Sequence, residues 1–346
     1  MLTRERLVKY GINKMTHLHE LARLKYPDGF HSEAFKKVLG GLYVDDFLLL
    51  DRNNNTVLHN SVASGGIICL PKEFLTRDNL LLQNEFGDSV LSKLLEYGHA
   101  GVIPEESWNT IGATTVCSMK NGKTPAHSYT VITAAAKFGQ LKQLPSHYLT
   151  LENLTDDAFD RYSTLHIAAS YGHLDQLPSG LLNAEALLFH SHTGHSVLEE
   201  AVVNGNCYQI RGLITGDMLT KPCTDGNTVL HLLAASKSLD YIDAELVDPA
   251  MCAKKNNSGN SVFVVALHNG SLGSIPKHCL TWEALTSGNL LEKVVRAEQT
   301  DVLLGSRFPD RARALLGDAW WERNNAVLAD MDKLALQDQA TDIDIF

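Results

Sequence analysis

Residues 163–174 read STLHIAASYGHL, and this stretch decides the fold because related phrases recur along the chain. Each phrase begins with Ser or Thr, which is followed two residues later by a large apolar residue, then by small apolar residues and usually by Gly. The Ser and Thr positions that begin the phrases, called anchors below, are Thr56, Ser89, Thr130, Ser163, Ser196, Thr228 and Ser261. Successive anchors lie 33, 41, 33, 33, 32 and 33 residues apart. This spacing indicates an internal repeat of about 33 residues.

Two places depart from the regular spacing. The segment 123–128 accounts for most of the excess in the 41-residue interval, so it is interpreted as an inserted loop. Thr16 begins a weaker eighth phrase, 40 residues before Thr56, that lacks the Gly.

Each phrase predicts a short helix with defined ends. The Ser or Thr side chain can accept a hydrogen bond from an unpaired backbone N–H in the first turn. The small Ala residues allow neighbouring helices to approach closely. Since one repeat cannot bury its own apolar face, neighbouring repeats are expected to stack. The residues that suit a left-handed helix end are Gly65, Gly98, Gly139, Gly172, Gly205 and Gly270.

The period and the phrase resemble those of the ankyrin-repeat family, whose pattern is T-P-L-H-x-A-A followed by G-H-L. Residues 163–174 are the closest match, and the resemblance covers about residues 14–290. It implies an all-α fold, an ankyrin-like helical repeat solenoid with helical terminal caps. It also implies that His59, His166 and His231 join the hydrogen bonds at the helix starts. It says almost nothing about chemistry.

The second half of each repeat departs from the common ankyrin pattern and looks like a divergent, bacterial variant. Because Pro suits a first helical turn and disrupts a helix interior, each Pro predicts a break and a new short turn. The Pro-bearing pairs are Leu70-Pro71, Ile103-Pro104, Leu144-Pro145, Leu177-Pro178 and Ile275-Pro276. A second short helix is then predicted after each of the cap-forming residues Thr76, Asn109, Thr150, Asn183, Thr215, Asp248 and Thr281.

The predicted organisation has four parts. Residues 1–50 form an N-terminal cap that includes the degenerate repeat, and residues 51–290 form seven ankyrin-like repeats. Residues 291–337 form a C-terminal helical cap, with dimerisation or binding of a target as alternatives for this helix. Residues 338–346 form a flexible acidic tail, with a docking or secretion peptide as the alternative. Trp321 lies about 100° around its helix from Trp320, so either one of them is exposed to a partner or a wide seam buries both.

Composition excludes several classes of function. The chain has 346 residues, with 30 Lys and Arg against 40 Asp and Glu, and a formal net charge of −10. This argues against a dedicated nucleic-acid binder and against an anionic membrane surface as the main partner. No membrane span or secretory signal is expected. Six scattered Cys without a CxxC motif indicate free thiols in a reducing compartment, either the cytoplasm or a host cytoplasm if the protein is an effector.

Candidate chemistry is sparse in the sequence. Three His lie within residues 190–195, but that segment falls in a loop between repeats, so solvated side chains are expected and no metal or other cofactor is predicted. Cys207 could act as a nucleophile, yet no His or acidic pattern supports that role. The nucleotide-binding and hydrolase motifs are missing from the sequence, so the chain is not expected to be an enzyme.

The leading hypothesis is a non-catalytic protein–protein interaction module that inhibits, scaffolds or recruits a partner through its concave face and loop tips. One alternative is an acidic inhibitor or effector that occupies the basic groove of a nucleic-acid-binding protein. Others are a metal- or thiol-dependent enzyme and a self-assembling array. The partner and the oligomeric state stay open. The candidate partner-binding residues are Asn54, Asp88, Lys123, His127, His192, His195, Asp225, Asn257 and Trp321.

Overall fold

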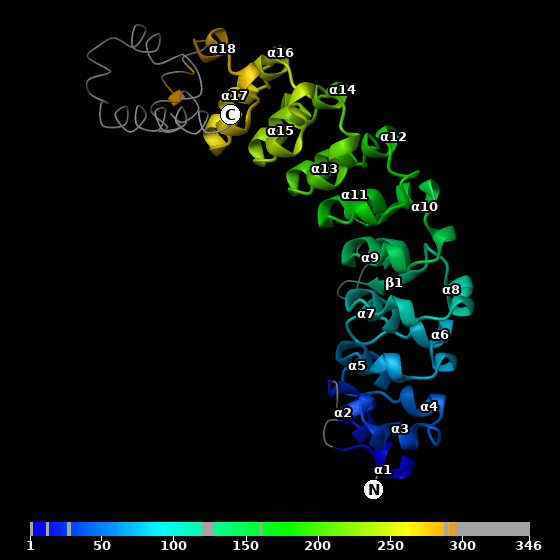
Figure 1. The fold of residues 1–346 in the computed structure, drawn as a ribbon. Helices are drawn as coiled ribbons and strands as arrows, with labels where there is room; N and C mark the ends of the chain where they lie inside the picture. The colour runs from blue at the N-terminus through cyan, green and yellow to red at the C-terminus, as the bar shows by residue number, and fades with distance from the viewer. Residues whose placement is uncertain are drawn as a thin grey trace, which may run out of the picture. The chain divides into compact units, whose positions relative to one another are not determined.

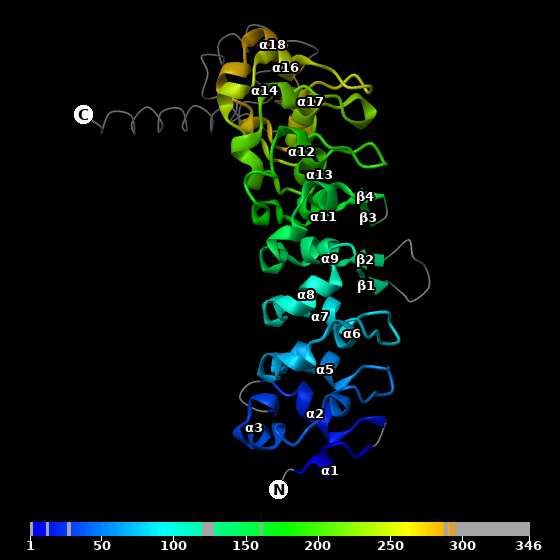
Figure 2. The same ribbon diagram turned by 90° about the vertical axis from the view of Figure 1, so that its right-hand side faces the viewer.

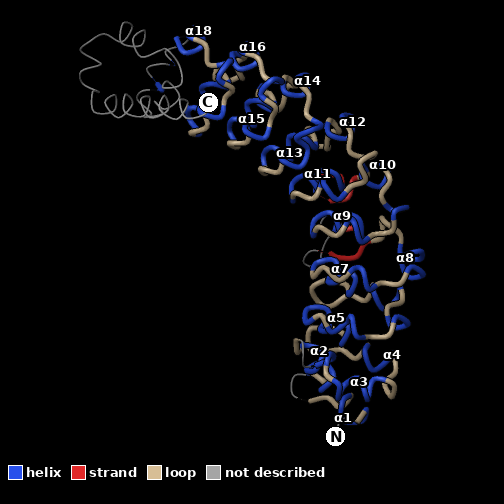
Figure 3. Tube along the Cα trace, viewed as in Figure 1, coloured by secondary structure: helices blue, strands red, loops and turns tan. Residues whose placement is uncertain are grey.

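The computed structural model is mostly helical, as the all-α fold class requires (Figures 1 and 3). It describes residues 3–11, 14–25, 29–119, 128–159, 161–286, 290 and 293–294. The chain divides into two compact units, residues 1–197 and residues 198–346. No helix among the described residues combines the length and the apolar character that a bilayer crossing requires.

The helices predicted after the anchors pack against one another in chain order within the first unit (Figure 1). They are α2 (His17–Arg23), α5 (Val57–Ser64), α7 (Val90–Glu96), α9 (Val131–Phe138) and α11 (Thr164–Tyr171). In the second unit α15 (Val229–Ala235) packs against α17 (Val262–Asn269). A further helix, α13 (Val197–Val203), begins at the last residue of the first unit.

The ends of these helices follow the predicted chemistry. Thr56, Thr130 and Ser261 each accept a hydrogen bond from the backbone N–H three residues later. All six predicted glycines have a positive φ, for example 76° at Gly65. One repeat has Lys237 at this position, and its φ of 58° shows that the left-handed turn persists without Gly.

Short 3-10 turns and a second short helix complete each repeat. The turns directly after the first helices are η3 (Gly66–Cys69), η5 (Ala100–Val102), η8 (Leu141–Gln143), η10 (Leu174–Gln176), η11 (Cys207–Leu213), η13 (Leu239–Tyr241) and η15 (Leu272–Ser274). The next turns are η4 (Lys72–Phe74), η9 (Ser146–Tyr148), η14 (Ala244–Leu246) and η16 (Lys277–Cys279). Pro71, Pro145 and Pro276 directly precede three of them, which confirms the predicted break.

The second short helices begin after the predicted cap residues in six repeats. They are α6 (Arg77–Leu80), α10 (Leu151–Thr155), α12 (Ala184–Leu187), α14 (Gly216–Leu219), α16 (Pro249–Ala253) and α18 (Trp282–Thr286). The prediction at Asn109 is wrong, because a single helix, α8 (Glu105–Ile111), runs through it from Pro104. Glu105 and Glu106 occupy the first turn of α8, where negative charge is stabilised, so the helix begins directly after Pro104.

Besides α2, the N-terminal segment contains the short elements α1 (Arg4–Leu7), η2 (Gly29–His31), α3 (Glu33–Leu39) and α4 (Val44–Phe47). Phe30 and Phe35 stack with ring centroids 4.2 Å apart, and Phe47 lies 4.9 Å from Phe74 of the following repeat. Arg4 donates two hydrogen bonds of 2.8 Å to the buried carboxylate of Asp46. These contacts join the segment to the stacked helices.

Two short strand pairs were not predicted. β1 (Val116–Met119) pairs with β2 (Ser128–Thr130), and β3 (Asp157–Phe159) pairs with β4 (Tyr162–Ser163), both antiparallel. They lie at the hairpins that precede two anchors. Other repeats have a single bridge at this place, such as Leu50 with Thr56. Figure 2 shows that the hairpins of the first unit project on the same side of the stacked helices.

Candidate functional site

Several hairpins are held by a histidine at the start of the first helix of the preceding repeat. In the repeat that begins at Thr56, His59 Nδ1 accepts hydrogen bonds from the Thr56 backbone N–H at 3.1 Å and from the Thr56 hydroxyl at 2.8 Å. Since Nδ1 is an acceptor, the ring proton lies on Nε2, which donates to the Asp88 carbonyl at 3.1 Å. One imidazole therefore joins its own helix start to the hairpin of the next repeat.

The same contact recurs in other repeats. His166 and His231 bond the carbonyls of His195 and Asn260, each 29 residues later, at 3.0 and 3.2 Å. His19 of the weak first repeat bonds the Asn55 carbonyl at 3.4 Å. The histidines implied by the family resemblance thus take part in the cap network. Burial lowers the pKa of His59 to about 4 and also lowers the pKa of His19 and His231.

Five of the described hairpins end in a five-residue segment, called a tip below, whose backbone conformation recurs. The N–H of the first residue donates to the carbonyl of the fifth in the tips 51–55, 84–88, 191–195, 223–227 and 256–260. In three tips the side-chain oxygen of the first residue also accepts from the backbone N–H groups of the third and fifth residues. These first residues are Asp51, Asn84 and Asn256.

Neighbouring tips are hydrogen-bonded to each other. The Glu85 N–H donates to the Asn53 carbonyl at 3.0 Å, and the Asn84 side-chain amide donates to Asn55 Oδ1 at 2.8 Å. In the second unit the Asn257 N–H donates to the Asp225 carbonyl at 3.2 Å, and the corresponding bond between Asn256 and Asn227 side chains measures 2.9 Å. The tips therefore form a row with a fixed backbone within each unit.

The predicted binding residues of the two units divide into two groups by their position within a tip. Asn54, His192, Asp225 and Asn257 occupy the second, third or fourth positions of their tips and are exposed. Asn54 and Asp225 have φ values of 57° and 60°, a conformation that Asn and Asp tolerate better than most residues.

Asp88 and His195 occupy fifth positions, where their carbonyls accept from His59 and His166. The Asp88 carboxylate is half-buried and lies 2.9 Å from Lys93 Nζ. Asp88 and His195 therefore help to hold their hairpins in place. Lys123, His127 and Trp321 lie outside the described residues, as do most of the predicted C-terminal cap and all of the acidic tail.

Sequence reasoning missed several exposed apolar residues, including one at a tip and two at helix ends. Phe86, at the third position of its tip, is 53% exposed. Tyr97 and Tyr171, directly before helix-end glycines, are 47% and 49% exposed. Phe138 occupies the corresponding position in the repeat between them, and Lys137 Nζ lies 5.1 Å from its ring centroid. The recurrence of an aromatic residue before the Gly was a signal that could have identified this second surface.

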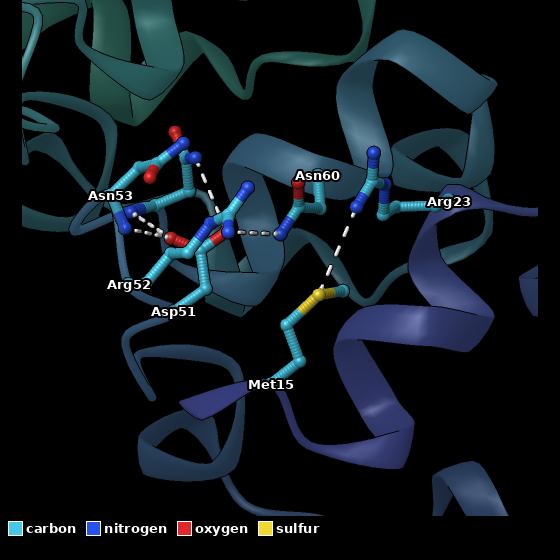
Figure 4. A pocket seen from close by; sticks show the side chains of 7 residues that line it. Met15, Arg23, Asp51, Arg52, Asn53 and Asn60 are labelled. Atoms are coloured by element: carbon cyan, nitrogen blue, oxygen red, sulfur yellow. Dashed lines mark hydrogen bonds between the residues drawn. The ribbon is translucent and has the colours of Figure 1, made fainter. Parts of the chain in front are cut away.

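A polar pocket of about 270 Å³ lies beside the first tip (Figure 4). Its lining residues are Met15, Arg23, Asp51, Arg52, Asn53, Asn55 and Asn60. Burial alone would raise the pKa of Asp51, but hydrogen bonds from the Asn55 and Asn53 backbones and from two Asn side chains outweigh it, and the pKa lies below its usual value. The pocket therefore contains a fixed carboxylate and two guanidinium groups.

Two thiols are candidates for chemistry, and burial raises the pKa of both. Cys207 is buried, and burial raises its pKa. Cys69 lies 3.3 Å from His31 Nδ1, a pair that sequence reasoning missed, yet burial raises its pKa as well. A thiol with a raised pKa supplies little thiolate near neutral pH. Within the described part of the chain, no three His, Cys, Asp or Glu residues are placed to hold a metal ion.

No family model matches the chain, and a search of curated proteins finds no match either.

Proposed function

We propose that the chain is an ankyrin-like solenoid that binds another protein through its tips. The proposal on the fold is supported by the capped first helices that pack in chain order and by the recurring bonds from histidine to the next hairpin. The resemblance of residues 163–174 to the family phrase supports it independently. In such a stack each repeat contacts its neighbours, and one face stays available for binding.

The observation that carries the binding proposal is the contrast between tip backbones and tip side chains. The backbone bonds recur, whereas the exposed side chains differ from one tip to the next. The central residues read Arg-Asn-Asn at 52–54, Glu-Phe-Gly at 85–87, His-Thr-Gly at 192–194 and Asn-Ser-Gly at 257–259. A fixed backbone lowers the entropy that ordering would cost on binding, and varied side chains provide specificity. This combination suits protein recognition.

The proposed activity is non-catalytic, and binding would inhibit, scaffold or recruit the partner. The protonated state that burial favours for Cys69 and Cys207 is consistent with this interpretation. We place the protein in a cytoplasm, its own or that of a host.

A second candidate is an acidic inhibitor that occupies a basic groove. It is favoured by the segment 240–248 of the second unit, in which Asp240, Asp243, Glu245 and Asp248 are all exposed. Such a surface would complement a positively charged nucleic-acid-binding site. Binding through it would weaken steeply as salt is raised, whereas binding through the mixed polar and aromatic tips would depend less on salt.

The experiment is affinity capture from lysate of the native source, followed by mass spectrometry, with two variants beside the wild-type chain. The tip variant carries Phe86→Ala and His192→Ala, and the control carries Asp78→Ala and Glu185→Ala on the second short helices. A stoichiometric protein captured by wild type and control and lost by the tip variant would support the proposal. Equal capture by all three chains would contradict it. Loss on raising salt, with the tip variant unaffected, would favour the acidic candidate.

A further inference from the structure

The pocket beside the first tip combines two guanidinium groups with the Asp51 carboxylate, whose hydrogen-bonding positions are already occupied. Figure 4 shows Arg23 on the side of the pocket opposite Asn53, with the Asp51 and Asn60 side chains joined between them. Arg23 extends from the last turn of α2, and Arg52 from the second position of the tip. Both are exposed, in a chain whose net charge is −10.

The Asp51 carboxylate is already engaged. Its Oδ1 accepts from the Asn53 and Asn55 backbone N–H groups, both at 2.9 Å. Its Oδ2 accepts from the side-chain amides of Asn55 at 3.2 Å and Asn60 at 3.5 Å. Four donors therefore satisfy this carboxylate, so it fixes the floor of the pocket and has little capacity left to pair with an arginine.

The two arginines keep most of their hydrogen-bonding capacity. Among the described residues, Arg23 donates only to the sulfur of Met15, at 3.8 Å, and Arg52 has no ion pair or hydrogen bond. Each guanidinium offers five N–H donors in a planar arrangement that matches two oxygens of one group. A ligand with two acceptor oxygens could therefore bind the N–H donors of these arginines.

We propose that this pocket binds the carboxylate of a Glu or Asp side chain in an extended segment of the partner protein. The inference rests on the proposed function and specifies the chemistry of its ligand. The neighbouring surface favours a segment in which apolar residues flank the acid. Leu50, directly before Asp51, is 45% exposed, and Phe86 follows Glu85, which is bonded to the pocket residue Asn53. Arginine and carboxylate then form charge-assisted bonds on a fixed backbone.

The test uses a short fluorescein-labelled peptide of alternating leucine and glutamate, titrated into the full chain and followed by anisotropy. A second peptide has glutamine in place of glutamate. The pocket variant carries Arg23→Gln and Arg52→Gln. The matched control carries Lys72→Gln and Arg77→Gln, which remove the same charge from exposed positions in the second half of the repeat that begins at Thr56. Because all four side chains are exposed, each variant should keep the wild-type circular dichroism spectrum.

Binding of the glutamate peptide should weaken at least about tenfold in the pocket variant and stay unchanged in the control, since charged hydrogen bonds are removed only from the pocket. The glutamine peptide should bind wild type as weakly as the glutamate peptide binds the pocket variant. Equal affinity of wild type and pocket variant would overturn the proposal. So would competition by inorganic phosphate at much lower concentration than acetate, because it would indicate a phosphate site.

The peptide result and the capture result can fail separately. In one case, capture of the partner depends on Phe86 and His192, but the pocket variant binds the glutamate peptide as tightly as wild type does. This result would refute the pocket proposal and leave the proposed function supported. A pocket-dependent peptide without tip-dependent capture would refute the proposed function while supporting the carboxylate site.

Discussion

Acidification provides a direct test of the histidine contacts that hold the hairpins. His59 Nδ1 accepts from the backbone N–H and the hydroxyl of Thr56, so a proton on that nitrogen would break both bonds. Burial lowers the pKa of His59 from 6.5 to about 4. The folded chain therefore requires the neutral ring over a pH range in which the unfolded chain binds a proton.

The magnitude follows from proton linkage. Because the folded pKa lies below the unfolded value, the contribution of His59 to stability is complete above about pH 6.5 and is lost as the pH falls toward 4. Between about pH 7 and pH 5 the unfolded state takes up roughly 0.7 of a proton at this position, and the folded state takes up almost none. The free energy of unfolding should fall by about 2 kcal/mol from His59 alone.

The assay compares wild type with His59→Gln by urea unfolding, followed by circular dichroism at both pH values. Gln does not titrate, so the stability difference between the two chains should shrink by about 2 kcal/mol on acidification, while other titrating groups cancel. His192→Gln, at an exposed tip position, is the control and should stay within about 0.5 kcal/mol of wild type. A His59→Gln cost that is equal at both pH values would refute the reasoning.

The remaining predictions concern stability and use urea unfolding at neutral pH. Ala168 is fully buried, so Ala168→Leu should lower the free energy of unfolding by about 1–3 kcal/mol. Asn257→Ala, at an exposed tip, should change it by less than about 0.5 kcal/mol. Similar effects at both sites would contradict the assignment of core and tip. Lys237→Gly should stabilise the chain by about 1 kcal/mol, because it relieves the steric strain of a side chain at a φ of 58°. Gly65→Ala, at a φ of 76°, should destabilise the chain by a similar amount. Changes of the opposite sign would argue against the left-handed helix ends. Asn84→Ala removes an acceptor from two backbone N–H groups and should cost about 1–3 kcal/mol, and a neutral result would show that the tip bonds contribute nothing.

The helix starts and helix ends were predicted well from sequence, because they depend only on residues within one repeat. A Thr three residues before a His can form the cap at Thr56 without knowledge of any other repeat, and Gly65 needs only its own backbone conformation. The same local reasoning failed at Asn109. There the cap-forming residue competes with Glu105 and Glu106, which favour a helix that starts earlier.

The contacts that sequence reasoning missed join different repeats. The bond between Asn84 and Asn55 links residues 29 positions apart, and nothing in either tip alone predicts it. The pocket likewise combines Arg23 of one repeat with Arg52 and Asn60 of the next. Because tip residues were interpreted as variable loop positions, their structural bonds could be recognised only once neighbouring tips were placed side by side.

The measurement that tests the central claim most directly is hydrogen–deuterium exchange of the chain with and without the captured partner, read by mass spectrometry. If the row of tips is the recognition surface, binding should slow exchange in peptides that contain residues 52–54, 85–87 or 192–194, with little change in the second short helices α6 and α12. Protection confined to α6, α12 or the acidic segment 240–248, with tip peptides unchanged, would contradict the account.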